Sequence, residues 1–65
     1  MNIEEFPEFL KCKDVAEILN TSLATVSRLL NKKIINGVRS FGGWKIPKDE
    51  LKRVIDRELN RQKIL

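Results

Sequence analysis

The residues with the clearest chemical capacity lie in one short stretch of the chain, LNTSLATVSRLLNKK at residues 19–33. Its apolar residues recur at helical spacing, so the residues between them share one face of a predicted helix. That face carries only small, hydroxyl, amide and cationic side chains: Ala24, Thr25, Ser27, Arg28 and Asn31, with Lys32 at its edge. Because such groups form hydrogen bonds and carry positive charge, the face is suited to an anionic, hydrogen-bonding partner.

The charges of the chain are divided unevenly, although the net charge is only +4. Residues 1–20 hold two bases and five acids, a net charge of −3. Residues 21–48 hold six bases and no acid (+6), and residues 49–65 hold five bases and four acids (+1). A basic block of this length without an acid indicates a polyanionic partner. A chance cluster on a solvated face is the alternative.

The composition argues against an enzyme and against a metal or cofactor site. The 65 residues include no histidine and a single cysteine, Cys12. Histidine-based acid–base or triad chemistry is therefore excluded, a structural zinc site is not expected, and no internal disulfide can form. We expect Cys12 to be a small buried residue without a redox role.

The length corresponds to one small domain, which we place over residues 1–65, with a lead-in at 1–9 and a domain body at 10–61. No run approaches the roughly 20 apolar residues that span a bilayer. The acidic start, MNIEEFPEFL, lacks the layout of a signal peptide. We therefore expect a cytoplasmic, nucleoid-associated protein with no membrane partner.

Two short helices are predicted before the middle of the chain. The first covers about residues 13–19, with an apolar stripe at Cys12, Val15, Ile18 and Leu19. Asn20 should end it, because Asn tolerates the left-handed conformation found at helix ends. The second helix covers about residues 23–32, with Ser22 as its N-cap. Its buried stripe is Val26, Leu29 and Leu30.

After the second helix, the spacing of the apolar residues changes from a helical period to the alternation of a β-hairpin. The segment VRSFGGWKI alternates around Gly42-Gly43, which predicts a two-residue turn flanked by Phe41 and Trp44. Both aromatic residues are expected to pack against the domain rather than to stack on bases. Asn36-Gly37 is a second turn signal, which allows a short third strand at Ile34-Ile35.

A third helix is predicted for residues 48–61. Pro47 can open it, and Asp49 and Glu50 in its first turn favour the helix dipole. Its apolar stripe consists of Leu51, Val54, Ile55 and Leu59. In the lead-in, Phe6, Phe9 and Leu10 are expected to pack onto the core.

The order helix, helix, hairpin, helix predicts a mainly α fold with a small β-hairpin, arranged as a winged helix-turn-helix. Ala16 supplies the small residue where the second helix crosses the first, and Asn20 supplies the turn residue four positions later. A plain helical corner has the same spacing and is the alternative.

The second helix and the hairpin supply the candidate site. Arg28 and Asn31 can read base edges. Hydroxyl groups and the N-terminus of the helix can bind phosphate. The full set of candidate DNA-binding residues is Ser22, Ala24, Thr25, Ser27, Arg28, Asn31, Lys32, Arg39, Lys45 and Lys48.

Taken together, these motifs resemble the excisionase-type members of the MerR-like winged-helix group. The matching segments are VAEIL at 15–19, NTS at 20–22, TVSRLL at 25–30, WKIP at 44–47 and KDEL at 48–51, so the resemblance covers about residues 10–56. It implies sequence-specific binding of duplex DNA, with the second helix in the major groove and the wing at the neighbouring minor groove or its phosphates. Excisionases of this group bend DNA and steer a phage or transposon integrase towards excision.

The chain departs from the family pattern at four positions. Lys11 stands where the family often has a capping Thr, so we expect the first helix to be poorly capped. Asn20 replaces the turn glycine, and Ser27 replaces a frequent aromatic residue. Gly43 takes the position of the wing-tip arginine, so Arg39 and Lys45 are expected to supply the wing contacts.

Three functions agree with this pattern. The first is an architectural DNA-binding factor, an excisionase of a phage or mobile element, with double-stranded DNA and an integrase or recombinase as partners. The second is a minimal transcriptional regulator. The third is a protein-interaction module that has lost DNA binding. We also expect a monomer in solution that associates head to tail on directly repeated sites, through its acidic N-terminal segment and basic middle.

Overall fold

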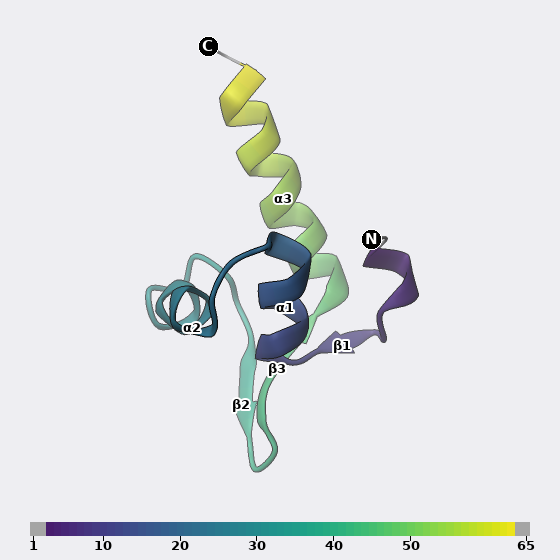
Figure 1. Ribbon diagram of the computed structural model, residues 1–65, viewed down its shortest axis with the longest axis vertical. Helices are drawn as coiled ribbons and strands as arrows, with labels where there is room; N and C mark the ends of the chain where they lie inside the picture. The colour runs from purple at the N-terminus through teal and green to yellow at the C-terminus, as the bar shows by residue number, and fades with distance from the viewer. Residues whose placement is uncertain (1–2, 64–65) are drawn as a thin grey trace.

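A computed structural model describes the backbone of residues 3–63 and the side chains of residues 3–58. A short 3-10 helix, Ile3–Glu5, precedes strand β1 (Phe9–Leu10) and helices α1 (Cys12–Leu19) and α2 (Leu23–Asn31). Strands β2 (Val38–Ser40) and β3 (Gly43–Pro47) form a hairpin, and helix α3 (Lys48–Lys63) follows. The hairpin extends away from the helices at one end of the molecule, and α3 extends at the other (Figure 1). This arrangement is the predicted winged helix-turn-helix.

Helix α1 begins and ends through local hydrogen bonds. The Asp14 carboxylate accepts a hydrogen bond of 3.0 Å from the backbone N–H of Lys11, the N-cap residue. A capping box consists of two hydrogen bonds, one to the N-cap side chain and one to the side chain of the third helical residue. Because a Lys side chain has no acceptor, only the second of these bonds, accepted by Asp14, can form in α1. The expected lack of capping is thus only partly correct. Asn20 ends the helix with φ 55° and ψ 52°, the predicted left-handed conformation.

Helices α1 and α2 pack against each other across a turn of three residues, Asn20–Ser22. Ala16 is buried, as is Val26 on the facing side of α2, and the N–H of Thr21 donates to the Ala16 carbonyl at 2.9 Å. The small Ala side chain allows the close helix approach that a helix-turn-helix requires. Further along α2, Leu30 is buried and Leu29 is half-buried, which places the predicted stripe against the core.

The sheet has three antiparallel strands in the order β1-β3-β2. Leu10 of β1 pairs with Ile46 of β3, and both side chains are completely buried. The third strand is therefore Phe9–Leu10, and the alternative at Ile34-Ile35 is wrong: Ile35 enters the core without joining the sheet. Phe9 is 57% exposed, because it alternates with Leu10 and so points to the other face of the sheet.

The hairpin turn lies one residue earlier than predicted. Ser40 pairs with Gly43, so Phe41 and Gly42 form the loop. Gly43 has φ +99°, a conformation that side chains disfavour. Ordinary φ values in the loop followed by a glycine at positive φ are typical of a turn with a glycine bulge. Phe41 consequently lies at the tip of the hairpin and is fully exposed, at 113% of its reference area, contrary to the expected packing.

The Asn36-Gly37 pair does not form a turn. The chain reverses at Lys32 and Lys33, and Lys33 adopts φ 61°. Gly37 has another reason to be glycine: a Cβ there would lie 3.1 Å from Ile46 Cγ1 and 3.2 Å from Leu30 Cδ2. The close approach of the backbone to the core therefore excludes a larger residue without rearrangement.

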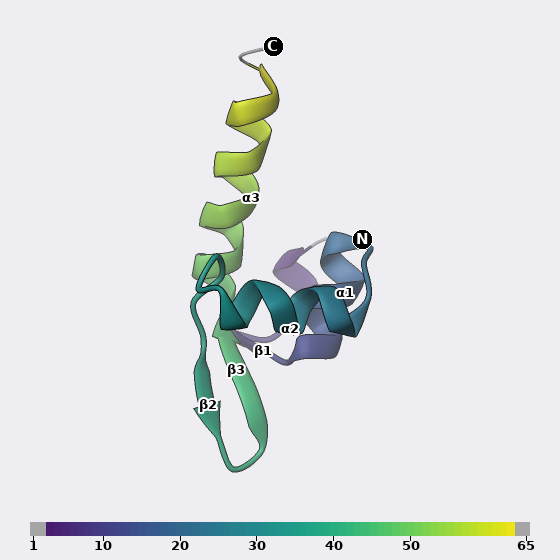
Figure 2. The ribbon, with the colours of Figure 1, turned by 90° about the vertical axis from the view of Figure 1, so that its left-hand side faces the viewer.

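Helix α3 packs its first turns on the core and then extends past it (Figures 1 and 2). Leu51 and Val54 are buried, and Ile55 is half-buried. The predicted contribution of Leu59 lies outside the described side chains. The Lys52 ammonium is 2.7 Å from Glu4 Oε1, which ties α3 to the N-terminal 3-10 helix. No described helix is long and apolar enough to cross a membrane.

Candidate nucleic-acid interface

The outward face of α2 carries the predicted polar set. Arg28 and Asn31 are exposed, one helical turn apart, while Val26 and Leu30 point inward. Thr25 is half-buried, and the other candidates on or beside α2 are exposed: Ser22, Ala24, Ser27 and Lys32. Since α2 contains no acid, this face presents hydrogen-bonding groups and positive charge without a neighbouring carboxylate on the same helix.

Ser22 and Thr25 order the first turn of α2. The Ser22 hydroxyl accepts a hydrogen bond of 3.2 Å from the backbone N–H of Thr25, and the two hydroxyl oxygens are 3.0 Å apart. This is the predicted N-cap. The cap fixes where α2 and its polar face begin. The hydroxyl groups of Ser22 and Thr25 are also hydrogen-bonded to each other.

The hairpin carries two basic side chains on opposite faces of a short ribbon. Val38 pairs with Lys45 and Arg39 pairs with Trp44. The Arg39 guanidinium carbon lies 5.7 Å from the centroid of the Trp44 ring, within the range of a cation–π contact. Both Arg39 and Lys45 are exposed. The ribbon therefore combines two accessible cations with an aromatic platform that orients one of them.

Helix α2 and the hairpin lie on the same side of the molecule. In Figure 2, α2 crosses the front of the domain and the hairpin extends below its C-terminal end. Lys32 and Lys33 are exposed in the segment that connects them. Because the helix and the hairpin lie on the same side, they can approach one partner together.

Lys48 is not brought to this surface. Its side chain is 16% exposed and its ammonium lies 3.7 Å from Glu4 Oε1. The same ammonium donates a hydrogen bond of 3.0 Å to the Phe6 carbonyl. The tertiary fold therefore uses this predicted DNA-binding residue to attach the N-terminal segment to α3.

The comparisons with known proteins assign the family. Residues 9–58 match the sequence model of a helix-turn-helix domain. The match spans α1, α2, the hairpin and most of α3.

The chain belongs to this helix-turn-helix family.

The helix-turn-helix assignment supports DNA binding by this domain. It rests on the family model, since neither the search of curated proteins nor the search of solved structures found a significant match. The prediction of a helix-turn-helix domain is therefore confirmed.

None of the exposed large apolar residues of the helix-turn-helix domain, which are Phe9, Leu23, Ile34, Val38 and Phe41, is among the predicted contacts. Two of them lie at the start of α2 and at the tip of the wing. Leu23 lies 57% exposed at the first position of α2, and Phe41 lies at the hairpin tip. The sequence pattern identifies Leu23 only as the start of a helix. It predicts packing for Phe41, although the place of this residue directly before a Gly-Gly pair is a signal for a turn residue.

Glu50 connects α3 to the segment that leads into the hairpin. Its Oε2 accepts hydrogen bonds from the backbone N–H of Asn36 at 3.3 Å and from Asn36 Nδ2 at 3.2 Å. Arg53 donates to the other carboxylate oxygen. Burial opposes ionisation of Glu50, but the hydrogen bonds from Arg53 and Asn36 outweigh it, so its pKa lies below the ordinary value.

Cys12 packs against the core but is half-buried, and not buried as predicted. Burial raises the pKa of its thiol, and the charge of Arg39 only partly opposes that effect. A raised pKa keeps the thiol protonated and unreactive near neutral pH.

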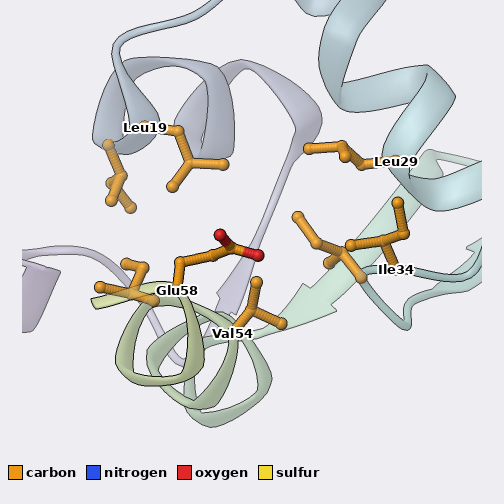
Figure 3. A pocket seen from close by; sticks show the side chains of 8 residues that line it. Leu19, Leu29, Ile34, Val54 and Glu58 are labelled. Atoms are coloured by element: carbon orange, nitrogen blue, oxygen red, sulfur yellow. The ribbon is translucent and has the colours of Figure 1, made fainter. Parts of the chain in front are cut away.

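An apolar hollow lies between α1, the end of α2 and α3 (Figure 3). It encloses about 540 Å³ and is lined mainly by aliphatic side chains, among them Leu19, Leu29, Ile34 and Val54. The carboxylate of Glu58 extends from α3 between them. Within residues 3–58, no group of His, Cys, Asp and Glu side chains is arranged to hold a metal ion.

Proposed function

We propose that this domain binds duplex DNA sequence-specifically, with α2 in the major groove and the β2–β3 wing at the adjacent minor groove. The observation that carries the proposal is the acid-free segment 21–48, which forms α2 and the wing. Every basic residue of the segment 21–48 except Lys48 is exposed. Exposed cations without neighbouring carboxylates favour a phosphate backbone.

The side chains of this surface suggest separate roles. Arg28 can donate two hydrogen bonds to a guanine edge, and Asn31 can form a pair with adenine. The side chain of Ala24 is small, so α2 can lie deep in the major groove. Lys32, Arg39 and Lys45 are assigned to phosphates, which set register and orientation without reading sequence.

The salt dependence of binding tests this proposal. With Arg28, Lys32, Arg39 and Lys45 in phosphate or groove contact, the plot of log Kd against log salt should have a slope of about 3 to 4 for a monomer on duplex DNA. Lys45→Gln should lower that slope by about 1, whereas Lys48→Gln should leave it unchanged. Absence of binding to any duplex at low salt would exclude the proposal.

We further propose an excisionase of a phage or mobile element as the biological role. The support is the resemblance of the VAEIL, TVSRLL and WKIP segments to excisionase-type members of the MerR-like winged-helix group. A minimal transcriptional regulator needs the same DNA-reading surface. Selection of bound sites from random DNA separates the two: sites beside a recombinase attachment region support the excisionase, and sites overlapping promoters support the regulator.

Side-by-side binding on repeated sites is the proposed source of additional affinity. A single small module buries only roughly 600–1,000 Å² on DNA. Glu5 and Glu8 are exposed near the N-terminus and can face the basic surface of a neighbour. Glu4 is less suited to this role, because it pairs with Lys52 and Lys48 of its own chain. Changing Glu5 and Glu8 to Gln should therefore reduce cooperativity more than affinity for one site, whereas a palindromic footprint would contradict the arrangement.

A further inference from the structure

The tip of the wing carries one large apolar side chain and little else. Phe41 is fully exposed, and apart from the adjacent residues no heavy atom lies within 4 Å of where a Cβ would stand on Gly42 or Gly43. The ring is therefore open to solvent at the end of the hairpin, and the glycines beside it are not covered by other parts of the domain. In Figure 2 this end of the hairpin is the part of the wing farthest from α3.

The hairpin holds the tip in a defined shape. The Ser40 hydroxyl donates a hydrogen bond of 3.1 Å to the Gly43 carbonyl across the loop. Below the tip, Trp44 is half-buried against the core and Arg39 lies over its ring. An exposed aromatic residue on a braced turn loses less conformational freedom on binding than one on a flexible loop.

The charges beside Phe41 indicate which partner it meets. Arg39 and Lys45 flank the tip on the two strands, and β2 and β3 contain no acid. A cationic ribbon is attracted to phosphates on both sides of a minor groove. An apolar wedge between such contacts is the arrangement by which minor-groove proteins separate stacked base pairs and kink a duplex.

We propose that Phe41 inserts from the minor groove into one base-pair step beside the α2 site, partly unstacking it and bending the DNA. This inference rests on the proposed DNA binding and deepens it, because it assigns a specificity-determining role to the wing tip. Pyrimidine–purine steps unstack most easily. The domain should therefore prefer a TA or CA/TG step at the position of Phe41, although the aromatic ring forms no hydrogen bond with a base.

The test compares wild type with Phe41→Ala and Phe41→Leu on a site selected from random DNA. The duplex carries 2-aminopurine at each flanking step in turn, and its fluorescence rises where a base loses stacking. Wild type should raise the fluorescence at one step and bend a fragment in a permuted-site gel assay. Phe41→Ala should lose both signals and bind about tenfold more weakly, with an unchanged salt slope. Phe41→Leu should retain part of both, because it keeps an apolar wedge.

Phe9→Ala is the matched control, since Phe9 is also an exposed phenylalanine but lies on β1 away from the tip. It should keep the fluorescence signal and the bend. Equal bending by wild type and Phe41→Ala would overturn the inference while leaving the proposed DNA binding intact. The inference would also fail if Phe41→Ala changed only self-association in sedimentation without DNA, since the ring would then contact a second copy. Loss of all duplex binding by wild type would instead reject the proposed function itself.

Discussion

Arg39 and Trp44 face each other across the wing, with the guanidinium carbon 5.7 Å from the ring centroid. They are paired residues of adjacent antiparallel strands, so the hairpin register sets their contact. Trp44 also packs against the core on its buried part. The Trp44 ring therefore links an exposed cation to the interior of the domain.

Replacing the ring should release this cation. Trp44→Leu retains apolar volume but removes the aromatic face, and a cation–π contact at an exposed site is worth about 0.5–1 kcal/mol. We expect DNA affinity to fall by roughly two- to fivefold. Arg39→Gln in the Trp44→Leu background should cost less affinity than Arg39→Gln alone, which fluorescence anisotropy measures. Full additivity of the two changes would show that Trp44 does not position Arg39.

Arg28 and Lys45 should contribute to binding in different ways. Arg28→Ala should cost roughly 1–3 kcal/mol on the preferred site and reduce the preference over random DNA, because a base contact is lost. Lys45→Ala should weaken specific and random DNA about equally, because phosphate contacts carry no base information. Competition titrations with the preferred and the random duplex measure the loss of affinity of each variant for each DNA. The same loss of preference in both variants would contradict the assignment of base reading to Arg28 and phosphate contact to Lys45.

The two glycines of the wing should respond differently to alanine. Gly43 has φ +99°, where an L side chain is strained, whereas Gly42 lacks that restriction and has free space for a Cβ. Gly43→Ala should destabilise the hairpin by about 1 kcal/mol or more and weaken DNA binding. Gly42→Ala is the control and should change stability little. Thermal unfolding and anisotropy test the pair, and equal effects would show that the positive φ of Gly43 does not constrain the hairpin.

Glu50 should make stability depend on pH in acid. Its pKa is lowered in the folded chain, so it contributes stability that is present above its unfolded pKa, near 4.5, and lost as pH falls through the lower folded value. Glu50→Gln should reduce stability at neutral pH by about 1 kcal/mol and flatten the pH dependence below pH 4.5.

Asn36→Ala is the companion variant, because it removes the side-chain Nδ2 donor to Glu50 but keeps the backbone N–H donor and the carboxylate. It should weaken stability at neutral pH and retain part of the acid dependence through Arg53. Urea unfolding at several pH values provides the measurement. A wild-type stability that does not fall between about pH 5 and pH 3 would argue against ionised Glu50 as a stabilising group.

Local sequence signals determined the positions of the helices and the residues on the outward polar face of α2. Val26 and Leu30 fall on one side of α2 by helical period alone. The left-handed conformation of Asn20 and the cap at Ser22 depend on residues within a few positions along the chain. The acid-free face of α2 therefore follows from sequence without any knowledge of the rest of the fold.

Only the tertiary structure decided which residues distant segments bring together. The β1–β3 pairing joins Leu10 to Ile46. Strand β1 has only two residues, which is too short for a sequence pattern to predict its partner strand. Lys48 has the type and position of a DNA contact, but Glu4 and the Phe6 carbonyl, more than 40 residues away in the chain, bind its ammonium. Phe41 is exposed and not packed because the cross-strand pairing of Ser40 with Gly43 places it in the loop of the hairpin and not at the end of a strand.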